Sequence, residues 1–312
     1  MLASMYSSIS GMKNHQQQLD VTSNNIANVN TYGYKKGRAT FKDMISQQIQ
    51  GATAPNDTSG GVNPMQVGLG TQMGSIDTVH TQGSLQNTGR SLDLGISGDG
   101  FFTVGEHTGD WEGNNVAGAV DDDGNGYGNL NTSYTRAGNF YLDEQGHIVN
   151  QDGQYLIGNT TNSDNGEASV GDLPNVEGDT TLDDNNGDPG RIQIPADAES
   201  FSIGADGSVS FVSADGNQRV AGQVQMARFE NPGGLSKAGS NLFQPTDNSG
   251  EAQYNNPGDG AGELVPGTLE MSNVDLSEEF TNMITAQRGF QANTRGITTA
   301  DEVLQELMNL KR

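Results

Sequence analysis

Residues 275–308 read DLSEEFTNMITAQRGFQANTRGITTADEVLQELM. Apolar residues recur here at intervals that alternate between three and four, the heptad pattern of a helix that packs along one narrow stripe. Asp275, with Glu278 three residues later, is a candidate cap for the start of that helix. Gln287, Thr294 and Asp301 interrupt the stripe, whose members are Leu276, Phe280, Met283, Phe290, Ile297, Leu304 and Met308.

The other end of the chain carries the same pattern, interrupted at Gln16 and Ser23. A period of 3.5 favours a coiled-coil seam, and an ordinary amphipathic helix lying on a β core is the alternative. Because both ends have such a stripe, we expect residues 1–30 and 275–312 to pair as helices of one inner core domain. The N-terminal members of the seam are Leu2, Met5, Ile9, Met12, Leu19 and Ile26.

Composition excludes several classes of protein. The 312 residues include 15 Lys and Arg, 39 Asp and Glu and no Cys, which gives a formal net charge of −24. Such a charge argues against binding to nucleic acid or to anionic lipid, and no 18-residue apolar run predicts a membrane span. Leu, Ile, Val and Phe make up 19% of the chain. Because so few large apolar residues are available, we expect parts of the chain to gain order only by packing against other copies.

The central part of the chain is punctuated by turns. Residues 51–269 contain 39 of the 44 Gly and all nine Pro. Asp-Gly pairs at 99–100, 152–153, 206–207 and 215–216 supply the positive φ of tight hairpin turns. We therefore predict a mainly β protein with helical termini: an extended or β linker over 31–90, then an antiparallel β domain over 91–269 with acidic insertions at 106–132 and 158–190. The expected strands are 92–96, 101–104, 134–142, 155–157, 191–194, 201–203, 209–212 and 220–229.

Chemical motifs are sparse. Asp121, Asp123 and Asn125 match the first half of a calcium loop, but the position expected to hold a bidentate Glu is Thr132. An acidic solvated loop is the favoured reading of this segment. The four His have no metal-ligand spacing, and the sequence contains no nucleophile elbow or phosphate loop. We therefore predict no catalytic residue, no metal site and no cofactor. A secreted calcium-dependent β-domain binder is the leading competitor from another class.

Three blocks carry a family resemblance. NNIANVNTYGYKK from Asn24 and the block from Leu269 to Arg312 are similar to the terminal signatures of bacterial flagellar rod and hook proteins. SLDLGISGDGFFTV at 91–104 and YTRAGNF at 134–140 resemble the start of the β domain of this axial family. The positions that match the two terminal signatures are Asn24, Asn25, Ala27, Asn28, Thr31, Gly33, Lys35, Ser272, Asn273, Val274, Gln287 and Arg288.

The resemblance implies a structural, non-enzymatic subunit. Three segments look more like hook proteins than rod proteins: SNVDLSEEF, TRAGNFYLDEQGHIVNQDGQYLIG and ITTADEVLQELMNLKR. We therefore expect a homopolymer that forms the tubular hook, transmits motor torque as a universal joint and forms part of the export channel. The alternative is the distal rod protein of the basal body, because both proteins share the terminal signatures.

The resemblance also implies location and partners. Subunits of this family leave the cell unfolded through the flagellar type III export machinery without a cleaved signal peptide, and they reside in the extracellular hook or the basal body. The implied neighbours are the distal rod protein, the hook cap and the hook-filament junction proteins. Lys35, Lys36, Arg38 and Lys42 lie between residues 31 and 50. They form either a basic link to acidic β surfaces of neighbouring subunits or a solvated face.

Overall fold

The computed structural model describes residues 2–52, 54–55, 60–107, 111–112, 115–116, 130–160, 188–196, 198–214 and 216–310. They form two compact units. The first takes in the chain up to residue 29, residues 35–79 and the chain from 274 onward, and the second takes in 30–34 and 80–273. Both ends of the sequence therefore contribute to one unit, and nearly all of the middle forms the other.

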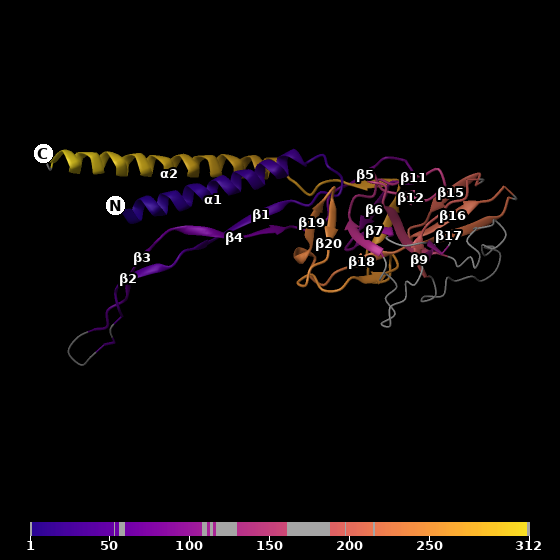
Figure 1. The fold of residues 1–312 in the computed structure, drawn as a ribbon, viewed down its shortest axis with the longest axis horizontal. Coiled ribbons are helices and arrows are strands. Elements are labelled where there is room, and N and C mark those ends of the chain that lie inside the picture. Colours follow the sequence, from indigo (N-terminus) through magenta and orange to yellow (C-terminus); the bar gives the residue numbers. More distant parts are fainter. Residues whose placement is uncertain are drawn as a thin grey trace. The chain divides into compact units, whose positions relative to one another are not determined.

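The first unit contains two helices and two β ribbons. Helix α1 (Leu2–Ala27) lies against α2 (Leu276–Leu310), as Figure 1 shows. Strand β1 (Gly37–Asp43) pairs antiparallel with β4 (Thr71–Thr78), and β2 (Ser46–Gln50) pairs with β3 (Met65–Gly68). Helix α1 also contacts β1 and β4. The prediction that the terminal helices pair is confirmed.

The helix pair is antiparallel with one constant register. Contacts join Ser8 to Gly296, Gly11 to Asn293, His15 to Gly289 and Asn25 to Glu279, and the residue numbers in each pair add to 304. Leu2, the first residue of α1, therefore lies level with residue 302. Because α2 continues to Leu310, its last two turns extend beyond α1.

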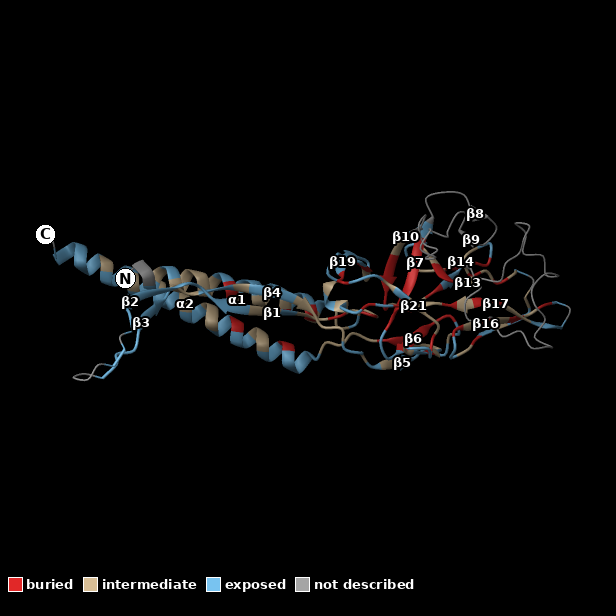
Figure 2. Cartoon of the chain, turned by 90° about the horizontal axis from the view of Figure 1, so that it is seen from below, coloured by how far each residue is buried: buried red, intermediate tan, exposed pale blue. Residues whose placement is uncertain are grey.

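The first unit has almost no apolar core. Among the described residues, Ala286 is the only hydrophobic residue of this unit that is buried. The other buried side chains of the unit are polar: Asn14, Thr22, Asn25, Lys35 and Glu279. Figure 2 shows the two helices and the β1–β4 ribbon mostly in the colours of exposed and intermediate residues. Apolar burial, the main source of folding free energy, is therefore small within this unit.

The second unit is an antiparallel β domain, as predicted. The main path of its largest sheet runs β15-β16-β17-β13-β7-β10-β20-β19, and every ladder between its strands is antiparallel. The strands of this path are β7 (Phe101–His107), β10 (Leu130–Thr135), β13 (Tyr155–Thr160), β15 (Ser200–Ile203), β16 (Ser208–Val212), β17 (Gln218–Val224), β19 (Ser236–Gly239) and β20 (Leu242–Gln244).

Shorter strands and one 3₁₀ turn, η1 (Pro232–Gly234), complete the domain. Two separate pairs join β5 to β23 and β6 to β22. The rest branch from two strands inside the main path: β18, with β21, pairs with β7, whereas β12, with β11, and β14, with β9 and β8, pair with β13. These strands are β5 (Leu85–Asn87), β6 (Leu94–Ser97), β8 (Trp111–Glu112), β9 (Asn115–Val116), β11 (Tyr141–Leu142), β12 (Ile148–Val149), β14 (Asp188–Arg191), β18 (Met226–Arg228), β21 (Gln253–Asn255), β22 (Glu263–Pro266) and β23 (Thr268–Glu270).

Three predicted strands differ from the structure. The run 134–142 divides into β10 and β11, and 220–229 divides into β17 and β18. The run 191–194 lies mostly outside β14, although Ile192 and Ile194 are buried. In each case apolar residues are buried without strand geometry, so their pattern alone overestimates strand length. Much of the predicted insertions 106–132 and 158–190 lies outside the described residues.

The Asp-Gly turns divide into two kinds. Gly153 and Gly207 have φ of +82° and close the β12–β13 and β15–β16 hairpins, and Gly216, with φ of +79°, lies in the β16–β17 turn. Gly100 also has positive φ, but it joins β6 to β7, which pair with other strands. The hairpin prediction at residues 99–100 is therefore wrong.

The apolar core of the protein lies in the β domain. The larger cluster is formed by side chains such as Leu94, Phe102 and Phe140, all fully buried. A second cluster brings Phe101, Tyr134, Phe229 and Phe243 together as edge-on aromatic pairs. The buried residues in Figure 2 accordingly gather on the strands of this domain. The domain can therefore be stable through its own packing.

Candidate assembly surface

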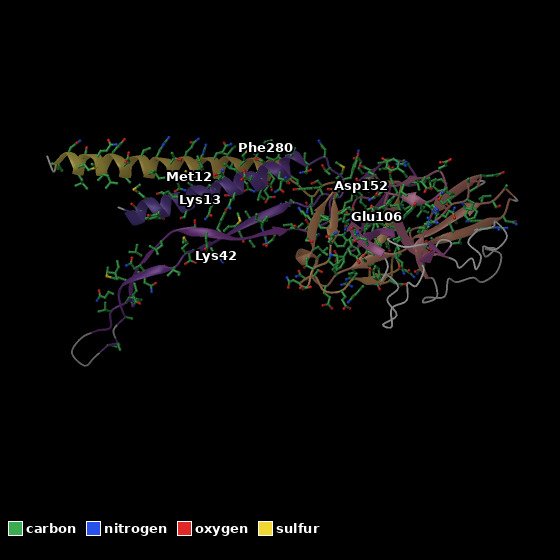
Figure 3. All side chains as sticks on the ribbon, in the orientation of Figure 1. Met12, Lys13, Lys42, Glu106, Asp152 and Phe280 are labelled. Carbon is green, nitrogen blue, oxygen red and sulfur yellow. The ribbon has the colours of Figure 1, made fainter. Side chains whose placement is uncertain are left out.

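The contact between α1 and α2 is made by small and polar residues. A side chain at Gly11 would come within 2.7 Å of the amide of Asn293, and one at Gly289 would come within 2.5 Å of the imidazole of His15. Met12 meets Thr294 at 3.8 Å from sulfur to hydroxyl, and Figure 3 labels Met12 on α1. Glycine lets the helices approach closely, but it adds little apolar area.

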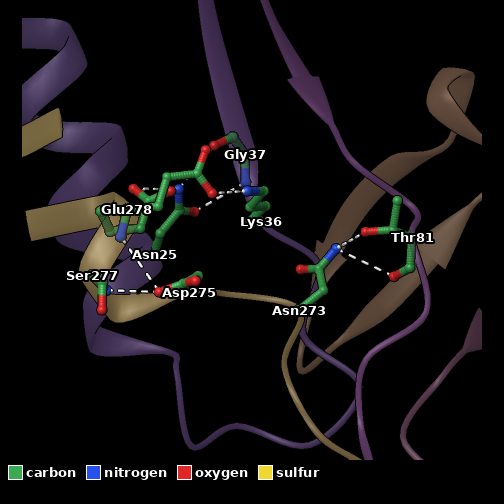
Figure 4. Close-up of polar contacts among 9 residues, drawn as sticks. Asn25, Lys36, Gly37, Thr81, Asn273, Asp275, Ser277 and Glu278 are labelled. Carbon is green, nitrogen blue, oxygen red and sulfur yellow. Dashed lines mark hydrogen bonds and ion pairs between the residues drawn. The ribbon is translucent and has the colours of Figure 1, made fainter. Parts of the chain in front are cut away.

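A polar junction links α1, β1 and the start of α2 (Figure 4). The Asn25 side chain donates to the Gly37 carbonyl at 2.8 Å and accepts from the Gly37 amide at 2.9 Å, as a neighbouring strand would. It also donates to Glu279 at 3.3 Å, and Lys36 Nζ lies 2.9 Å from the Glu278 carboxylate. The signature residue Asn25 therefore satisfies the backbone at the first residue of β1.

Asp275 caps α2. Its Oδ1 accepts from the backbone amides of Ser277 at 2.8 Å and Glu278 at 3.4 Å. This is the N-cap expected from the sequence. Glu278 does not complete the capping box in the described contacts, because its carboxylate binds Lys36.

A cavity of about 260 Å³ lies beside this junction, within the first unit. Its lining includes Thr22, Asn25 and Glu279, which are buried, together with Lys36 and Arg38. The lining carries both signs of charge, and Arg38 lies 3.7 Å from Asp77. The walls therefore combine polar and apolar groups, and their charged side chains are mostly paired.

The predicted seam residues occupy several different environments. Met5, Ile9, Met12, Leu19, Ile26, Met283, Phe290, Ile297 and Leu304 are of intermediate burial. Leu276, Phe280 and Met308 are exposed, at 40%, 50% and 75%, and the side chain of Leu2 lies outside the described residues. The most buried residues of α2, Glu279 and Ala286, lie on a face rotated from the predicted stripe. A seam formed by all of these residues stays a prediction.

Large hydrophobic side chains are exposed mainly on the first unit. Of the 18 such residues among those described, 16 belong to this unit, and only Tyr141 and Leu142 belong to the β domain. On the helices they include Phe280, labelled in Figure 3. On the ribbons they are Phe41, Met44, Ile45, Ile49, Val62, Met65, Val67 and Ile76. A surface of this kind marks a protein-protein contact.

The signature loop 31–34 packs onto the β domain. The Gly33 amide donates to the Glu270 carbonyl at 2.8 Å, and Asn241 donates to the Tyr32 carbonyl at 3.1 Å. The Lys237 ammonium lies 4.9 Å from the Tyr34 ring centroid, and burial lowers its pKa. Gly33 has φ of +68°, and a Cβ there would lie 2.5 Å from the Ala137 nitrogen. Only glycine fits at this position.

A buried ion pair lies under this loop. Arg136 Nη1 and Glu270 Oε2 are 3.2 Å apart, with side-chain exposures of 3% and 0%. Arg136 also donates to the Gly98 carbonyl, and the Gly83 amide donates to Glu270. Burial lowers the pKa of Arg136, and the charge of Glu270 opposes that shift. No sequence motif indicates this pair, because the two residues are 134 positions apart.

The remaining signature residues include both local and long-range contacts. Asn28 donates to the Asn24 carbonyl at 2.9 Å near the end of α1, and Asn273 donates to the Thr81 carbonyl at 3.2 Å (Figure 4). Lys35 is 1% exposed. Thr31, Ser272 and Val274 are half-buried, and Ala27, Gln287 and Arg288 are exposed.

In the structure, the four residues of the expected basic link have different environments. Lys35 is buried, Lys36 is bound to Glu278, and Arg38 lies near Asp77. Lys42, labelled in Figure 3, is exposed on β1. Of the four, Arg38 and Lys42 are therefore the exposed ones.

The pKa of one histidine of the β domain, His147, is strongly lowered. His147 is 1% exposed, and its ring contacts Tyr155 edge-on. Desolvation and, next, the charge of Arg191 lower the pKa of His147 to about 4, while Asp143 acts in the opposite direction. The imidazole is therefore neutral at physiological pH.

The described residues contain no group of three or more His, Cys, Asp or Glu able to hold a metal ion. The calcium-loop candidates Asp121, Asp123 and Asn125 lie outside the described residues. In the described part of the chain, neither helix combines the length and the apolarity needed to cross a bilayer.

A β domain with its own core, joined in one chain to a helical unit with little apolar core and many exposed apolar residues, is typical of a structural subunit that packs against other chains. Three family profiles match: "Flagella basal body rod protein" over residues 5–35, "Flagellar hook protein FlgE/F/G D1 domain" over 122–211 and "Flagellar basal body rod FlgEFG protein C-terminal" over 265–310.

Full-length relatives give the same family. The chain is 50% identical to the flagellar basal-body rod protein FlgG of Bacillus subtilis, with 100% of both chains covered. It is 36% identical to FlgG of Caulobacter vibrioides, with 97% of both covered, and 34% identical to the flagellar hook protein FlgE of Borreliella burgdorferi, with 100% of both covered. The chain belongs to the flagellar rod and hook axial protein family.

Family membership confirms that the chain is a structural axial protein of the flagellum and not an enzyme. The expectation of a hook protein is less well supported than its alternative, because the 50% identity is to a rod protein. The three segments on which that expectation rested match profiles that rod and hook proteins share.

Proposed function

We propose that the chain is the subunit of the distal rod in the flagellar basal body, where it polymerises into a shaft that transmits torque. The carrying observation is the 50% identity to a basal-body rod protein across the whole chain. The sequence suggested the distal rod as the alternative to the hook, and this proposal adopts that alternative.

Chain length supports the rod. The alignment with the Bacillus subtilis rod protein spans 314 positions, which is two more than the 312 residues of this chain. The alignment with the Borreliella burgdorferi hook protein spans 463 positions, so at least 151 of them have no residue here. A rod protein of the same size therefore matches this chain without large insertions.

The exposed apolar residues support polymerisation. Assembly would bury the side chains of the helices and ribbons against the same unit of neighbouring copies, which adds the apolar burial that this unit lacks in one chain. The β domain already has its own core. We therefore assign cohesion of the shaft to the first unit, with the predicted seam of α1 and α2 among its contacts.

The partners follow from the place in the shaft. Copies of the same chain are the main partners, and other axial proteins would contact the two ends of the polymer. Delivery through the flagellar type III export machinery, without a cleaved signal, is part of this proposal. Nucleic acid and membrane lipid are not among the partners that we propose.

Immunogold electron microscopy of isolated hook-basal bodies tests the proposal. Two antibodies are used, one raised against residues 158–190 and one against the exposed turn at 150–154, so that one inaccessible epitope does not decide the result. Gold on the straight shaft beneath the hook supports the rod. Gold on the curved segment would overturn the rod in favour of the hook, and flagella unlabelled by both antibodies would overturn an axial role.

A further inference from the structure

The charge of the chain is segregated between its two units. Residues 30–34 and 80–273 contain 29 acidic and six basic residues, a formal charge of −23. The residues of the first unit contain ten acidic and nine basic residues, a formal charge of −1. The excess negative charge of the protein therefore belongs almost entirely to the β domain.

The described surface of the β domain is acidic. Its exposed charged residues are eleven acidic and two basic, Arg228 and Lys237. The acidic ones are Asp99, Glu106, Glu144, Asp152, Glu199, Asp206, Glu230, Asp247, Glu251, Asp259 and Glu263. Figure 3 labels Glu106 and Asp152 among them.

Five of the six basic side chains of the domain have partners within it, and the sixth, Arg219, is half-buried. Arg136 is bound to buried Glu270, Arg90 lies 3.2 Å from Asp93, and Arg228 donates to the Gly260 carbonyl. Lys237 lies over Tyr34, and Arg191 lies over Tyr155. The exposed surface of the domain therefore offers few positive charges to a neighbouring copy. Two such domains repel each other electrostatically when they approach.

We propose that polymerisation of this chain is controlled by cations, which must screen the β domains before the apolar contacts of the first unit can hold copies together. The inference rests on the proposed function. Every copy brings the same acidic surface, so the repulsion grows with each added subunit. In this proposal the cations act as a diffuse screening atmosphere and not as ions held at one site. The described residues contain no group of three or more His, Cys, Asp or Glu able to hold a metal ion.

The screening length sets the expected salt range. It is about 30 Å at 0.01 M ionic strength and about 8 Å at 0.15 M, so the repulsion becomes local within this interval. Apolar contacts in the first unit are not weakened by salt. We therefore expect soluble subunits at low ionic strength and polymer at higher ionic strength, and a divalent salt should act at a lower concentration than NaCl.

Sedimentation and negative-stain electron microscopy of the purified full chain test this proposal across a NaCl series, with sucrose as the osmolyte control. One variant neutralises three acidic residues of the β domain (Glu144→Gln, Glu199→Gln, Glu230→Gln), and a matched control keeps the charge at the same positions (Glu144→Asp, Glu199→Asp, Glu230→Asp). All three side chains are exposed. We expect the NaCl concentration for half-maximal assembly to fall about twofold in the first variant and to stay unchanged in the control.

The outcomes separate the two proposals. A general effect of salt on apolar contacts would shift neither variant from the wild type, and it would overturn cation control of the β domain. Polymer that forms equally at the two ends of the NaCl series would also overturn the cation proposal while leaving the rod proposal intact. A chain that stays folded and monomeric at every salt concentration would contradict the rod proposal itself.

Discussion

Gly33 has two separate reasons to be glycine. Its φ of +68° is unfavourable for residues with a side chain, and a Cβ would also lie 2.5 Å from the backbone nitrogen of Ala137. Gly153 has a similar φ of +82°, but no atom lies within 4 Å of a Cβ built there. A side chain at Gly153 would therefore cause conformational strain alone, whereas a side chain at Gly33 would cause both strain and a steric clash.

We predict that Gly33→Ala destabilises the β domain by about 3 kcal/mol and Gly153→Ala by about 1 kcal/mol. The larger value includes the displacement of loop 31–34 from Glu270. Urea unfolding followed by aromatic fluorescence measures both values. Equal losses of unfolding free energy in the two variants would show that the clash at Gly33 adds no destabilisation.

His147 links the stability of the β domain to pH. Its pKa in the folded state is about 4, against 6.5 as the ordinary value, so between these values the unfolded state binds more protons. The contribution of neutral His147 is complete above pH 6.5 and declines as the pH falls towards 4. Between pH 7.5 and pH 5 the loss from this one group is about 2 kcal/mol.

We predict that His147→Gln loses about 2 kcal/mol less stability than the wild type over that pH interval. Urea unfolding at pH 7.5 and pH 5 gives the comparison, and each chain serves as its own reference. Carboxylates that titrate in both proteins cancel in the difference. Parallel pH profiles for the two chains would refute the role of His147.

The helix pair is the element at which sequence and structure differ most. The heptad stripes predicted both helices correctly, because the spacing of apolar residues is a local property. They did not indicate the contacts at Gly11, Gly289 and Asn25, since glycine and asparagine carry no apolar signal. The face of α2 that meets α1 follows these small and polar residues.

We predict that Gly289→Leu separates the helices, because the added side chain occupies the space of the His15 ring. Helical circular dichroism should melt at a lower temperature and polymer formation should decrease. Gln291→Leu, at an exposed position of the same helix, is the control and should change neither measurement. If Gly289→Leu matched the control, the close approach at residue 289 would have no role in pairing.

The β domain was predicted in its class and in several hairpins. Turn residues at 152–153 and 206–207 specify local pairing. The sequence did not indicate the pairing of β7 with β18 or the Arg136–Glu270 ion pair, because contacts between distant segments depend on the whole topology. The missed features are therefore the long-range ones.

At the scale of the whole molecule, the exposed large apolar residues of the described chain lie mainly on the first unit. Ile45 and Ile49 are 83% and 65% exposed on the β2 ribbon and its approach, whereas Tyr141 and Leu142 are 43% and 38% exposed on the β domain. Substitution by Asp within each pair therefore compares the role of exposed apolar residues in the two units.

We predict that Ile45→Asp with Ile49→Asp raises the critical concentration for polymerisation more than about tenfold, because each charge would have to be buried in an apolar contact. Tyr141→Asp with Leu142→Asp should raise it much less. Sedimentation at fixed ionic strength measures both, and unfolding of the β domain serves as a folding control. Equal effects of the two double variants would contradict a cohesive role for the first unit.

The composition of the first unit has a kinetic consequence. Helix α1 comes from the start of the chain and α2 from its end, so Ser8 must meet Gly296 across a loop that contains the entire β domain. Contacts of such high contact order form late, since closing a long loop costs entropy before any contact is gained. A chain that emerges from its N-terminus can thus complete its β domain first. The helix pair cannot form until α2 has emerged, so an incomplete chain can have the β1–β4 and β2–β3 ribbons of the first unit but not its paired helices.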